Sequence, residues 1–235
     1  MIVFNDRFFI KTYCFPTRIN YRNMLSIYRF VDESVSSEIN NVFFRKDRAF
    51  TVINDLSKGL DEIKAGFKKT VRYEVNKLLE QCVHVDVKNS PSESELSHLN
   101  EFYSSINMPK VTKWRVNKYG LKNIKTSSVY IDENLICFHV YVHTDKITRL
   151  LYSYCIKGKV ISSGLDASFY NRYLHFKDME YFKLLGCEYF DWGGISSKES
   201  LNGVDKFKIG FGGDIKASYS IYSPILSIIK AVNLI

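Results

Sequence analysis

Hydrophobic and polar positions in the second half of the chain follow first a helical and then a strand period. Residues 170–185 place aromatic and leucine side chains near one helical face, and Gly186 follows where a glycine ends many helices. Residues 188–192 predict a short aromatic strand, which ends at two glycines, Gly193 and Gly194. Because only glycine turns freely there, the pattern predicts a glycine corner at a strand end, where a ligand has room to bind.

The same patterns predict a regular series of elements from residue 82 onward. The predicted strands cover residues 82–87, 129–131, 135–142, 147–156, 188–192 and 215–222. The predicted helices cover residues 90–106, 113–118, 170–185 and 201–211. The order is therefore strand, two helices, three strands, helix, strand, helix and strand, and polar turns join the three central strands as an antiparallel meander.

The first part of the chain predicts short strands followed by one basic helix. The helix begins near Asp61 with acidic residues and continues to about Leu79 with basic ones, which suits the helix dipole. Lys68 and Arg72 are four residues apart and share a face, so they could hold phosphate oxygens. The alternative is that both are solvated surface residues, as exposed lysines and arginines usually are.

Length and composition indicate a folded chain with a basic surface. The 235 residues are 46% hydrophobic, enough for a core and for one domain or two small ones. The formal charge of +8 favours anionic partners, including nucleotides, coenzyme A, nucleic acid and anionic lipid. An ordinary lysine-rich surface would give the same charge, so the charge does not choose among these partners.

Cysteine usage and hydropathy favour a cytoplasmic protein without stable membrane insertion. The five cysteines are scattered without a CxxC pair, which predicts free thiols in a reducing compartment and no zinc site. No stretch has the roughly 20 apolar residues of a membrane span, and the N-terminus lacks a signal-peptide core. The apolar tail over residues 221–235 contains Pro224 and Lys230, so we expect a packed terminal segment.

Several short motifs in the last third of the chain carry a family resemblance. They are Asn-Arg-Tyr-Leu-His at 171–175, Gly186, Tyr-Phe-Asp-Trp-Gly-Gly at 189–194, Gly203, Phe-Lys at 207–208 and Phe-Gly at 211–212. In order and spacing, the chain resembles the Fem-like branch of the GNAT acyltransferases. This branch includes peptidoglycan-bridge aminoacyltransferases that use charged tRNA, and acyltransferases that act on nucleotide-linked amino sugars for surface polysaccharides.

The resemblance implies an α/β (α+β) GNAT fold, with a mixed, mostly antiparallel sheet flanked by helices. Residues 81–235 would form a complete GNAT acyltransferase domain. Residues 1–80 would be a truncated GNAT-like segment that contains the basic helix. Bridge-type Fem enzymes resemble two complete GNAT halves, often with a helical arm, and 235 residues are too few for both.

The resemblance also implies an enzyme. We expect an N-acyltransferase that moves an acyl group from acyl-CoA to the amino group of a dTDP- or UDP-linked deoxyamino sugar, for surface polysaccharide such as O-antigen or capsule. One alternative is a Fem-type transferase that uses aminoacyl-tRNA and a peptidoglycan precursor. An alternative of another class is a non-catalytic GNAT-like module that binds a nucleotide or RNA. A homodimer is compatible with each of them.

The resemblance places the donor phosphates at the start of the helix near residue 167, where free amides and the helix dipole favour anions. The donor-site residues are therefore Ser168, Asn171 and Arg172. The usual acyl-CoA motif, Arg or Gln followed two residues later by Gly-x-Gly/Ala, is absent from residues 162–172. Asn171 and Arg172 match the Fem-like pattern at this point. We still expect coenzyme A, because the chain is too short to resemble a full tRNA-dependent enzyme and the amides at the helix start can hold an anion whatever the side chains are.

Candidate catalytic residues follow from the same motifs. Lys208 matches the Phe-Lys lysine that stabilises developing negative charge at the reacting carbonyl, and Phe207 before it is assigned to substrate binding with Lys68 and Arg72. Asp191 could accept a proton or fix a sugar hydroxyl, or it could cap the glycine turn. His175 could act as a base or be a hydrogen-bonded structural residue.

We predict no metal site. His139 and His143 are four residues apart, but they lie on or beside a strand and no third ligand is spaced with them. GNAT chemistry needs no metal.

Overall fold

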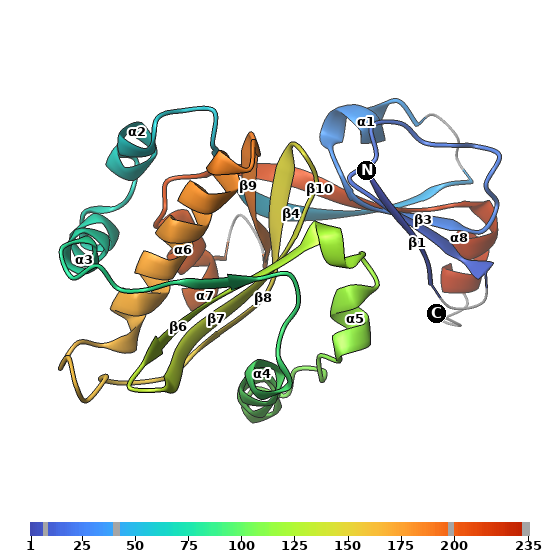
Figure 1. Cartoon of the computed structure of the whole chain (residues 1–235). Helices are drawn as coiled ribbons and strands as arrows, with labels where there is room; N and C mark the ends of the chain where they lie inside the picture. The colour runs from blue at the N-terminus through green and yellow to red at the C-terminus, as the bar shows by residue number, and fades with distance from the viewer. Residues whose placement is uncertain (7–8, 40–42, 197–199, 232–235) are drawn as a thin grey trace. The chain divides into compact units, whose positions relative to one another are not determined.

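The computed structural model describes residues 1–6, 9–39, 43–196 and 200–231, and these residues form two compact units that interleave along the chain (Figure 1). The first unit comprises Met1–Val52, Gly194–Asp205 and Ile215–Ile235. The second comprises Ile53–Gly193 and Lys206–Asp214. The domain boundary expected near residue 80 falls inside the second unit, and the division into a short and a complete GNAT-like part stays a prediction.

Short strands make up most of the first unit. Its elements are β1 Ile2–Asn5, β2 Lys11–Cys14, β3 Ser26–Val31, α1 Glu33–Ser37, the larger part of β4 Arg45–Asp55, most of β10 Asp214–Tyr222, and α8 Pro224–Ala231. The strands lie in the order β1, β2, β3, β10, β4; β2 and β3 are parallel, whereas β1–β2 and β3–β10 are antiparallel. Tyr28, Val31 and Ile221 are buried at the centre of this unit.

The second unit contains the predicted meander and the helices that cover it. Its elements are α2 Leu60–Ala65, α3 Lys69–Leu79, β5 Asp86–Lys88, α4 Glu93–Ser105, α5 Lys113–Asn117, η2 Leu121–Asn123, β6 Ile124–Ile131, β7 Asn134–His143, β8 Ile147–Cys155, α6 Ala167–Leu184, most of β9 Tyr189–Ile195 and most of α7 Gly203–Ile209. The strands lie in the order β9, β8, β7, β6, β5. The pair β8–β9 is parallel, and the other three ladders are antiparallel.

Side chains alternate between two helix-covered faces of this sheet, as the pleat of a strand requires. His139 of β7 is hydrogen-bonded to Asp178 of α6, so its side chain lies on the face of the sheet that α6 covers. Helix α3 packs against α6 on this same face (Figure 1). Tyr152 and Tyr154 of β8 contact Tyr103 and Phe102 of α4 on the other face. The sheet is therefore covered on both faces, and its strands are mostly apolar.

The predicted fold class and element order are confirmed. From β5 to β10 the elements follow as strand, two helices, three strands, helix, strand, helix and strand, in a mixed and mostly antiparallel arrangement flanked by helices. The predicted terminal segment is the helix α8, and the last residues expected in it, 232–235, lie outside the described part of the chain. No helix among the described residues is long and apolar enough to cross a membrane.

Three predicted elements differ in the structure. The strand expected over residues 129–131 already begins at Ile124, because the polar residues 125–128 also pair with β7. The prediction of a single basic helix is wrong, because the helix is broken into α2 and α3 at Gly66. The backbone of Gly66 lies so close to Gly212 that a side chain at Gly212 would collide with it. The backbone N–H of Lys68 then donates to the Gly210 carbonyl at 2.8 Å. The strand expected over residues 82–87 starts only at Asp86, since the preceding residues form a turn with Cys82 at a positive φ of 51°.

Candidate active site

Parallel strands β8 and β9 are paired at their starts only. The described ladder joins Ile147–Arg149 to Tyr189–Asp191 and ends there, although β8 continues to Cys155 and β9 to Ile195. A bulge in β8 follows directly: Leu150 pairs with Tyr141 and Tyr152 with Val140, so Leu151 is an extra residue. Bulges bend a strand and redirect its side chains, often next to active sites. The described pairing of β8 with β9 therefore stops at Arg149 and Asp191, and we call this point the parting of the two strands.

Lys208 lies at this parting. Its Nζ is 3.9 Å from the position that a Cβ on Gly193 would occupy, and the Leu150 carbonyl oxygen is 3.1 Å from the same position. Gly193 has a positive φ of 77°, a conformation that glycine adopts without strain. The missing side chain therefore lets the half-buried Lys208 ammonium approach the backbone at the end of the β8–β9 ladder.

Asp191 is held by two partners at the last pair of that ladder. Its Oδ2 forms an ion pair with Arg149, and its Oδ1 accepts the backbone N–H of Gly193 at 2.8 Å. The side chains of Asp191 and Arg149 are 4% and 11% exposed. Both carboxylate oxygens are engaged, so this geometry fits the turn-capping role better than that of a base open to substrate.

A buried polar network connects β7 to α6 on the α3 side of the sheet. Asp178 accepts hydrogen bonds from His139 Nδ1 at 2.7 Å and from the Tyr141 hydroxyl at 2.7 Å. The second ring nitrogen of His139 lies 2.8 Å from the Asn171 side-chain oxygen, and His175 Nδ1 lies 3.2 Å from the Tyr141 oxygen. Such a network specifies how α6 packs on the sheet, because each unpaired member would be costly.

His175 is enclosed by aromatic rings. It stacks on His139 with ring centroids 3.9 Å apart, and it contacts Trp192, Phe207 and Phe211. Burial lowers the pKa of His175 well below its ordinary value, and the charges of His139 and Lys208 lower it further. With 1% of the residue exposed, His175 fits the structural reading of its role, and no substrate amine reaches it in this conformation.

The ligand atoms of His139, His175 and Asp178 lie within 4.8 Å of one another, a separation that one metal ion could bridge. The two rings are stacked at an interplanar angle of 18°, however, and an imidazole binds a metal in its own ring plane. Two rings stacked in this way do not both point a nitrogen lone pair at one nearby ion. The hydrogen bonds among these groups account for the cluster without a metal.

The start of α6, the predicted donor-phosphate site, carries its own carboxylate. The Asp166 side chain accepts the Ser168 N–H at 2.9 Å, and this bond contributes most to lowering the pKa of Asp166. The Ala167 N–H donates to the Gly158 carbonyl at 2.9 Å. The N–H groups of Ala167 and Ser168 already have acceptors, so an anion bound here would find neither of them free. It would also be repelled by the Asp166 carboxylate.

Asn171 and Arg172 follow on the same helix and already have protein partners. Asn171 belongs to the buried network with His139. Arg172 forms an ion pair with Glu74 of α3, and its guanidinium lies 5.6 Å from the Phe207 ring centroid. Arg172 of α6 therefore contacts both α3 and α7, and α7 is the helix that carries Lys208.

Lys68 and Arg72 occupy the start of α3. Lys68 is the N-cap residue, exposed and without a side-chain capping bond, and Arg72 donates from Nη1 to the Ala65 carbonyl at 2.8 Å. Val71 between them packs against Gly210, one residue after α7 ends. The two cations therefore lie on the same side of the unit as the residues that end α7.

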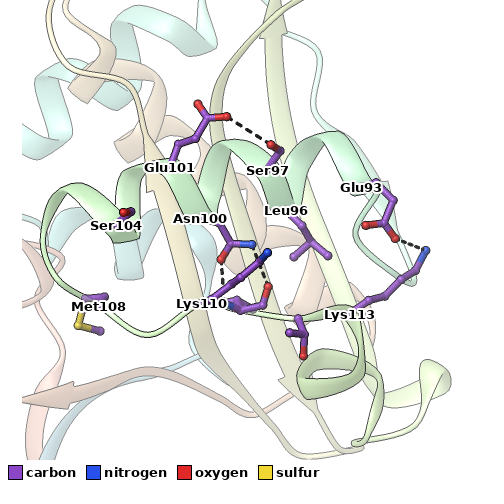
Figure 2. A pocket seen from close by; sticks show the side chains of 11 residues that line it. Glu93, Leu96, Ser97, Asn100, Glu101, Ser104, Met108, Lys110 and Lys113 are labelled. Carbon is purple, nitrogen blue, oxygen red and sulfur yellow. Dashed lines mark hydrogen bonds and ion pairs between the residues drawn. The ribbon is translucent and has the colours of Figure 1, made fainter.

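A pocket of about 710 Å³ lies elsewhere, between α4 and the segment that follows it (Figure 2). Figure 2 shows Glu93, Leu96 and Asn100 of α4 facing Lys110 and Lys113 across it. None of the site residues predicted from the sequence lines this pocket. It is separate from the residues around Lys208.

The structure thus brings most of the predicted residues together in the second unit, although several of them have structural partners. Sequence reasoning missed Tyr141, Asp178 and Glu74. Asp178 had a signal: Asn171, His175 and Asp178 are spaced by four and three, which puts polar side chains on the buried face of α6. Glu74 had none, since its partner comes from a distant part of the sequence.

No family model matches the chain, and no curated protein matches it. Solved structures do share its fold. FemX is 10% identical with a TM-score of 0.66, over 88% of this chain and 74% of FemX. L-PGS from Bacillus licheniformis is 13% identical with a TM-score of 0.55, over 89% of this chain and 73% of L-PGS. A conserved protein of unknown function from Bacteroides thetaiotaomicron is 8% identical with a TM-score of 0.54, over 83% of this chain and 69% of that protein.

Proposed function

We propose that this protein is an N-acyltransferase, and the position of Lys208 beside the parting of β8 and β9 carries the proposal. In this reaction an amine nitrogen attacks the acyl carbonyl carbon, negative charge develops on the carbonyl oxygen, and the thiolate or alcohol of the donor leaves. The attacking nitrogen loses a proton as the amide forms, and the leaving sulfur or oxygen ends protonated, so the reaction balances without a further reactant. A fixed ammonium near the carbonyl stabilises the charge that develops in the transition state.

The backbone next to Lys208 leaves space for this cation. Gly193 leaves room for its Nζ, and Arg149 holds Asp191 so that the turn at Gly193 keeps its shape. Lys208 and its neighbour Phe207 belong to one short helix, and the Phe207 ring packs against Trp192 and Phe211. The packing of Phe207 fixes this short helix, and the backbone of Lys208 is fixed with it.

For the substrates we propose acyl-CoA as donor and the amino group of a nucleotide-linked deoxyamino sugar as acceptor. The motifs around Asp191 and Lys208 support this through their resemblance to the Fem-like branch, which includes acyltransferases of nucleotide-linked amino sugars. Lys68 and Arg72 support it through their charge and their spacing at the start of α3, which suits a diphosphate. The compartment in this proposal is the cytoplasm.

One observation favours a second candidate, a Fem-type transferase that takes its acyl group from aminoacyl-tRNA. The Asp166 carboxylate occupies the start of α6, and Arg172 is paired with Glu74, so the usual phosphate site for coenzyme A is filled by protein groups. An aminoacyl ester on tRNA does not need that site. The likeness in fold to FemX is compatible with this donor.

A product assay distinguishes the two donors. The protein is incubated with acetyl-CoA and a dTDP-amino sugar, and separately with aminoacyl-tRNA and UDP-MurNAc-peptide, and the acceptors are analysed by mass spectrometry. An acetylated sugar supports the first candidate, and an aminoacylated peptide supports the second. Binding of a nucleotide or RNA without any product from a folded protein would indicate the non-catalytic module and contradict both.

A further inference from the structure

The segment from the end of α4 to the start of β6 is basic and contains no acidic residue. Between Phe102 and Ile131 the sequence has six cations and neither Asp nor Glu; the cations are Lys110, Lys113, Arg115, Lys118, Lys122 and Lys125. The whole chain has a formal charge of +8, so much of its positive excess is concentrated here. Such a concentration attracts an anionic surface over a distance set by the ionic strength.

The same segment exposes large apolar side chains. Ile106 is 46% exposed, Met108 50%, Trp114 58% and Leu121 54%. Monomeric proteins seldom gather large exposed apolar residues in one short stretch without an interaction to explain them. We call these four residues and the cations Lys110, Lys113, Arg115, Lys118 and Lys122 the basic apolar surface.

Local contacts fix the backbone beneath this surface. The Asn100 side chain of α4 clamps Val111, accepting its N–H at 2.7 Å and donating to its carbonyl at 3.0 Å. Val111 and Val116 are buried and point into the unit, so Trp114, two residues before Val116 on α5, lies on the outward side of this helix. The segment is thus anchored while its cations and apolar groups face outward.

Two further contacts order the cations of this segment. The Arg115 guanidinium donates to the Lys110 carbonyl at 3.2 Å, and the Lys118 ammonium lies 5.7 Å from the Trp114 ring centroid. On the α4 side the surface ends at the pocket of Figure 2, where Glu93 pairs with Lys113 at 3.3 Å. Acidic groups thus appear at the border of the surface.

We propose that the basic apolar surface binds the face of an anionic phospholipid bilayer. Lysine and arginine are attracted to anionic headgroups, each by about 1 kcal/mol near the surface. Tryptophan favours the membrane–water interface because one part of its ring system is apolar and the other polar. The aliphatic chains of Ile106, Met108 and Leu121 gain by entering the acyl boundary.

The aliphatic residues favour lipid over RNA. Nucleic acid binds through cations and through aromatic rings that stack on bases, and Trp114 with its basic neighbours could serve in this way. Exposed isoleucine, methionine and leucine add nothing to phosphate or base contacts. Because they accompany the cations throughout the segment, the surface fits a bilayer better. This inference concerns a different part of the unit from Lys208 and does not depend on the proposed chemistry.

Tryptophan fluorescence tests the proposal, since the chain has two tryptophans and Trp192 is 1% exposed. The full chain is mixed with vesicles of phosphatidylcholine and phosphatidylglycerol, and with vesicles of phosphatidylcholine alone. We expect a blue shift of the emission and quenching by brominated acyl chains with the anionic vesicles, and loss of both changes in Trp114→Phe. Unchanged emission with anionic vesicles, in a protein that is folded by circular dichroism, would overturn the proposal.

Co-sedimentation with the same vesicles separates the two kinds of residue. Replacing Lys110 and Lys122 by glutamine should lower partitioning about 25-fold, about fivefold per residue. Ile106→Ser with Met108→Ser should weaken binding even at low salt. The matched controls are Lys157→Gln with Lys159→Gln, and Ile161→Ser, which is 99% exposed outside the surface; they should bind as the wild type does.

Competition with single-stranded RNA completes the test. If RNA binds in place of vesicles, and if the glutamine variants weaken that binding whereas the aliphatic variants do not, the surface is a nucleic-acid site and the proposal is wrong. Equal loss in the control variants would also overturn it, because binding would then follow overall charge. Loss confined to the variants of the basic apolar surface supports it.

Discussion

The Tyr141 hydroxyl donates to the Asp178 carboxylate at 2.7 Å in the interior of the second unit. The same carboxylate oxygen accepts from His139, and the Tyr141 oxygen lies 3.2 Å from His175. Burial raises the pKa of Tyr141 well above its ordinary value, and the neighbouring Asp178 adds to this, so the phenol keeps its proton. One hydroxyl therefore connects an acidic residue and a histidine on successive turns of α6.

Removing this hydroxyl should destabilise the fold. In Tyr141→Phe the ring still packs, but Asp178 loses a donor and His175 loses a partner. We expect a loss of about 1 to 3 kcal/mol in the free energy of unfolding, as for a buried bond to a charged group. Urea unfolding measures it. Tyr73→Phe, at a residue that is 60% exposed, is the control and should change stability little. Equal stability of the two variants would contradict the network's role.

The pKa of His175 predicts acid sensitivity. In the unfolded chain a histidine takes up a proton as the pH falls through about 6.5, whereas the folded chain, in which the pKa of His175 is lowered, does not. Stability from this group is therefore present above about pH 6.5 and is lost on acidification, by up to about 1.4 kcal/mol per pH unit. Unfolding in urea at a series of pH values measures the slope.

Two variants isolate this contribution. His175→Gln should flatten the slope between neutral and mildly acidic pH, because the titrating group is gone. His84→Gln, at an exposed histidine, should keep the slope of the wild type. The explanation fails if His175→Gln is as acid-sensitive as the wild type.

The sequence predicted the elements of the second unit well because their patterns are local. The period of the helix around His175 and the glycine corner at Gly193 are both visible in one window of sequence. The break at Gly66 was not visible, because it depends on Gly212, which is far away in the chain. The absence of a side chain at Gly212 leaves room for the backbone of Gly66 between α2 and α3. A helical period continues across such a break, so it predicts a single helix.

The candidate site was only partly predictable. A motif located Lys208, but it did not indicate that Arg149 pairs with Asp191 or that Glu74 pairs with Arg172. Ion pairs between distant segments have no local pattern. The motif therefore suggested an open base and an open phosphate contact, where the structure has partnered side chains.

Lys208→Ala tests the proposed oxyanion stabilisation. We expect turnover to fall by about a hundredfold or more, as for removal of one transition-state donor, with the fold preserved because the side chain is half-buried at the end of a short helix. Lys206→Ala, at an exposed lysine of the same helix, is the matched control and should retain turnover. An unchanged turnover number in Lys208→Ala would exclude this role.

Lys68 and Arg72 are tested together. If they hold the diphosphate of the acceptor, replacing both by alanine should raise the Michaelis constant of the acceptor much more than it lowers turnover, since such contacts bind ground state and transition state alike. Replacing Lys58 and Lys64 of the α2 region removes equal charge and serves as control. A normal acceptor constant in the Lys68 and Arg72 double variant would make them surface residues only.

The ion pair of Asp191 and Arg149 decides between a structural and a catalytic aspartate. Their side chains are 4% and 11% exposed, and removal of one partner leaves the other charge buried, which typically costs about 3 to 5 kcal/mol. We therefore expect Asp191→Asn to destabilise the protein strongly in urea, and Arg149→Leu to do the same. Neither variant should shift the pH profile of turnover among molecules that remain folded.

The double variant completes the cycle. With Arg149→Leu and Asp191→Asn together, no unpaired charge is left, so the loss of stability should be clearly smaller than the sum of the two single losses. A general base would behave differently: Asp191→Asn would abolish turnover with little change in stability, and Arg149→Leu would not offset it. Additive single losses, or lost turnover in a stable Asp191→Asn protein, would contradict the structural assignment and return Asp191 to the chemistry beside Lys208.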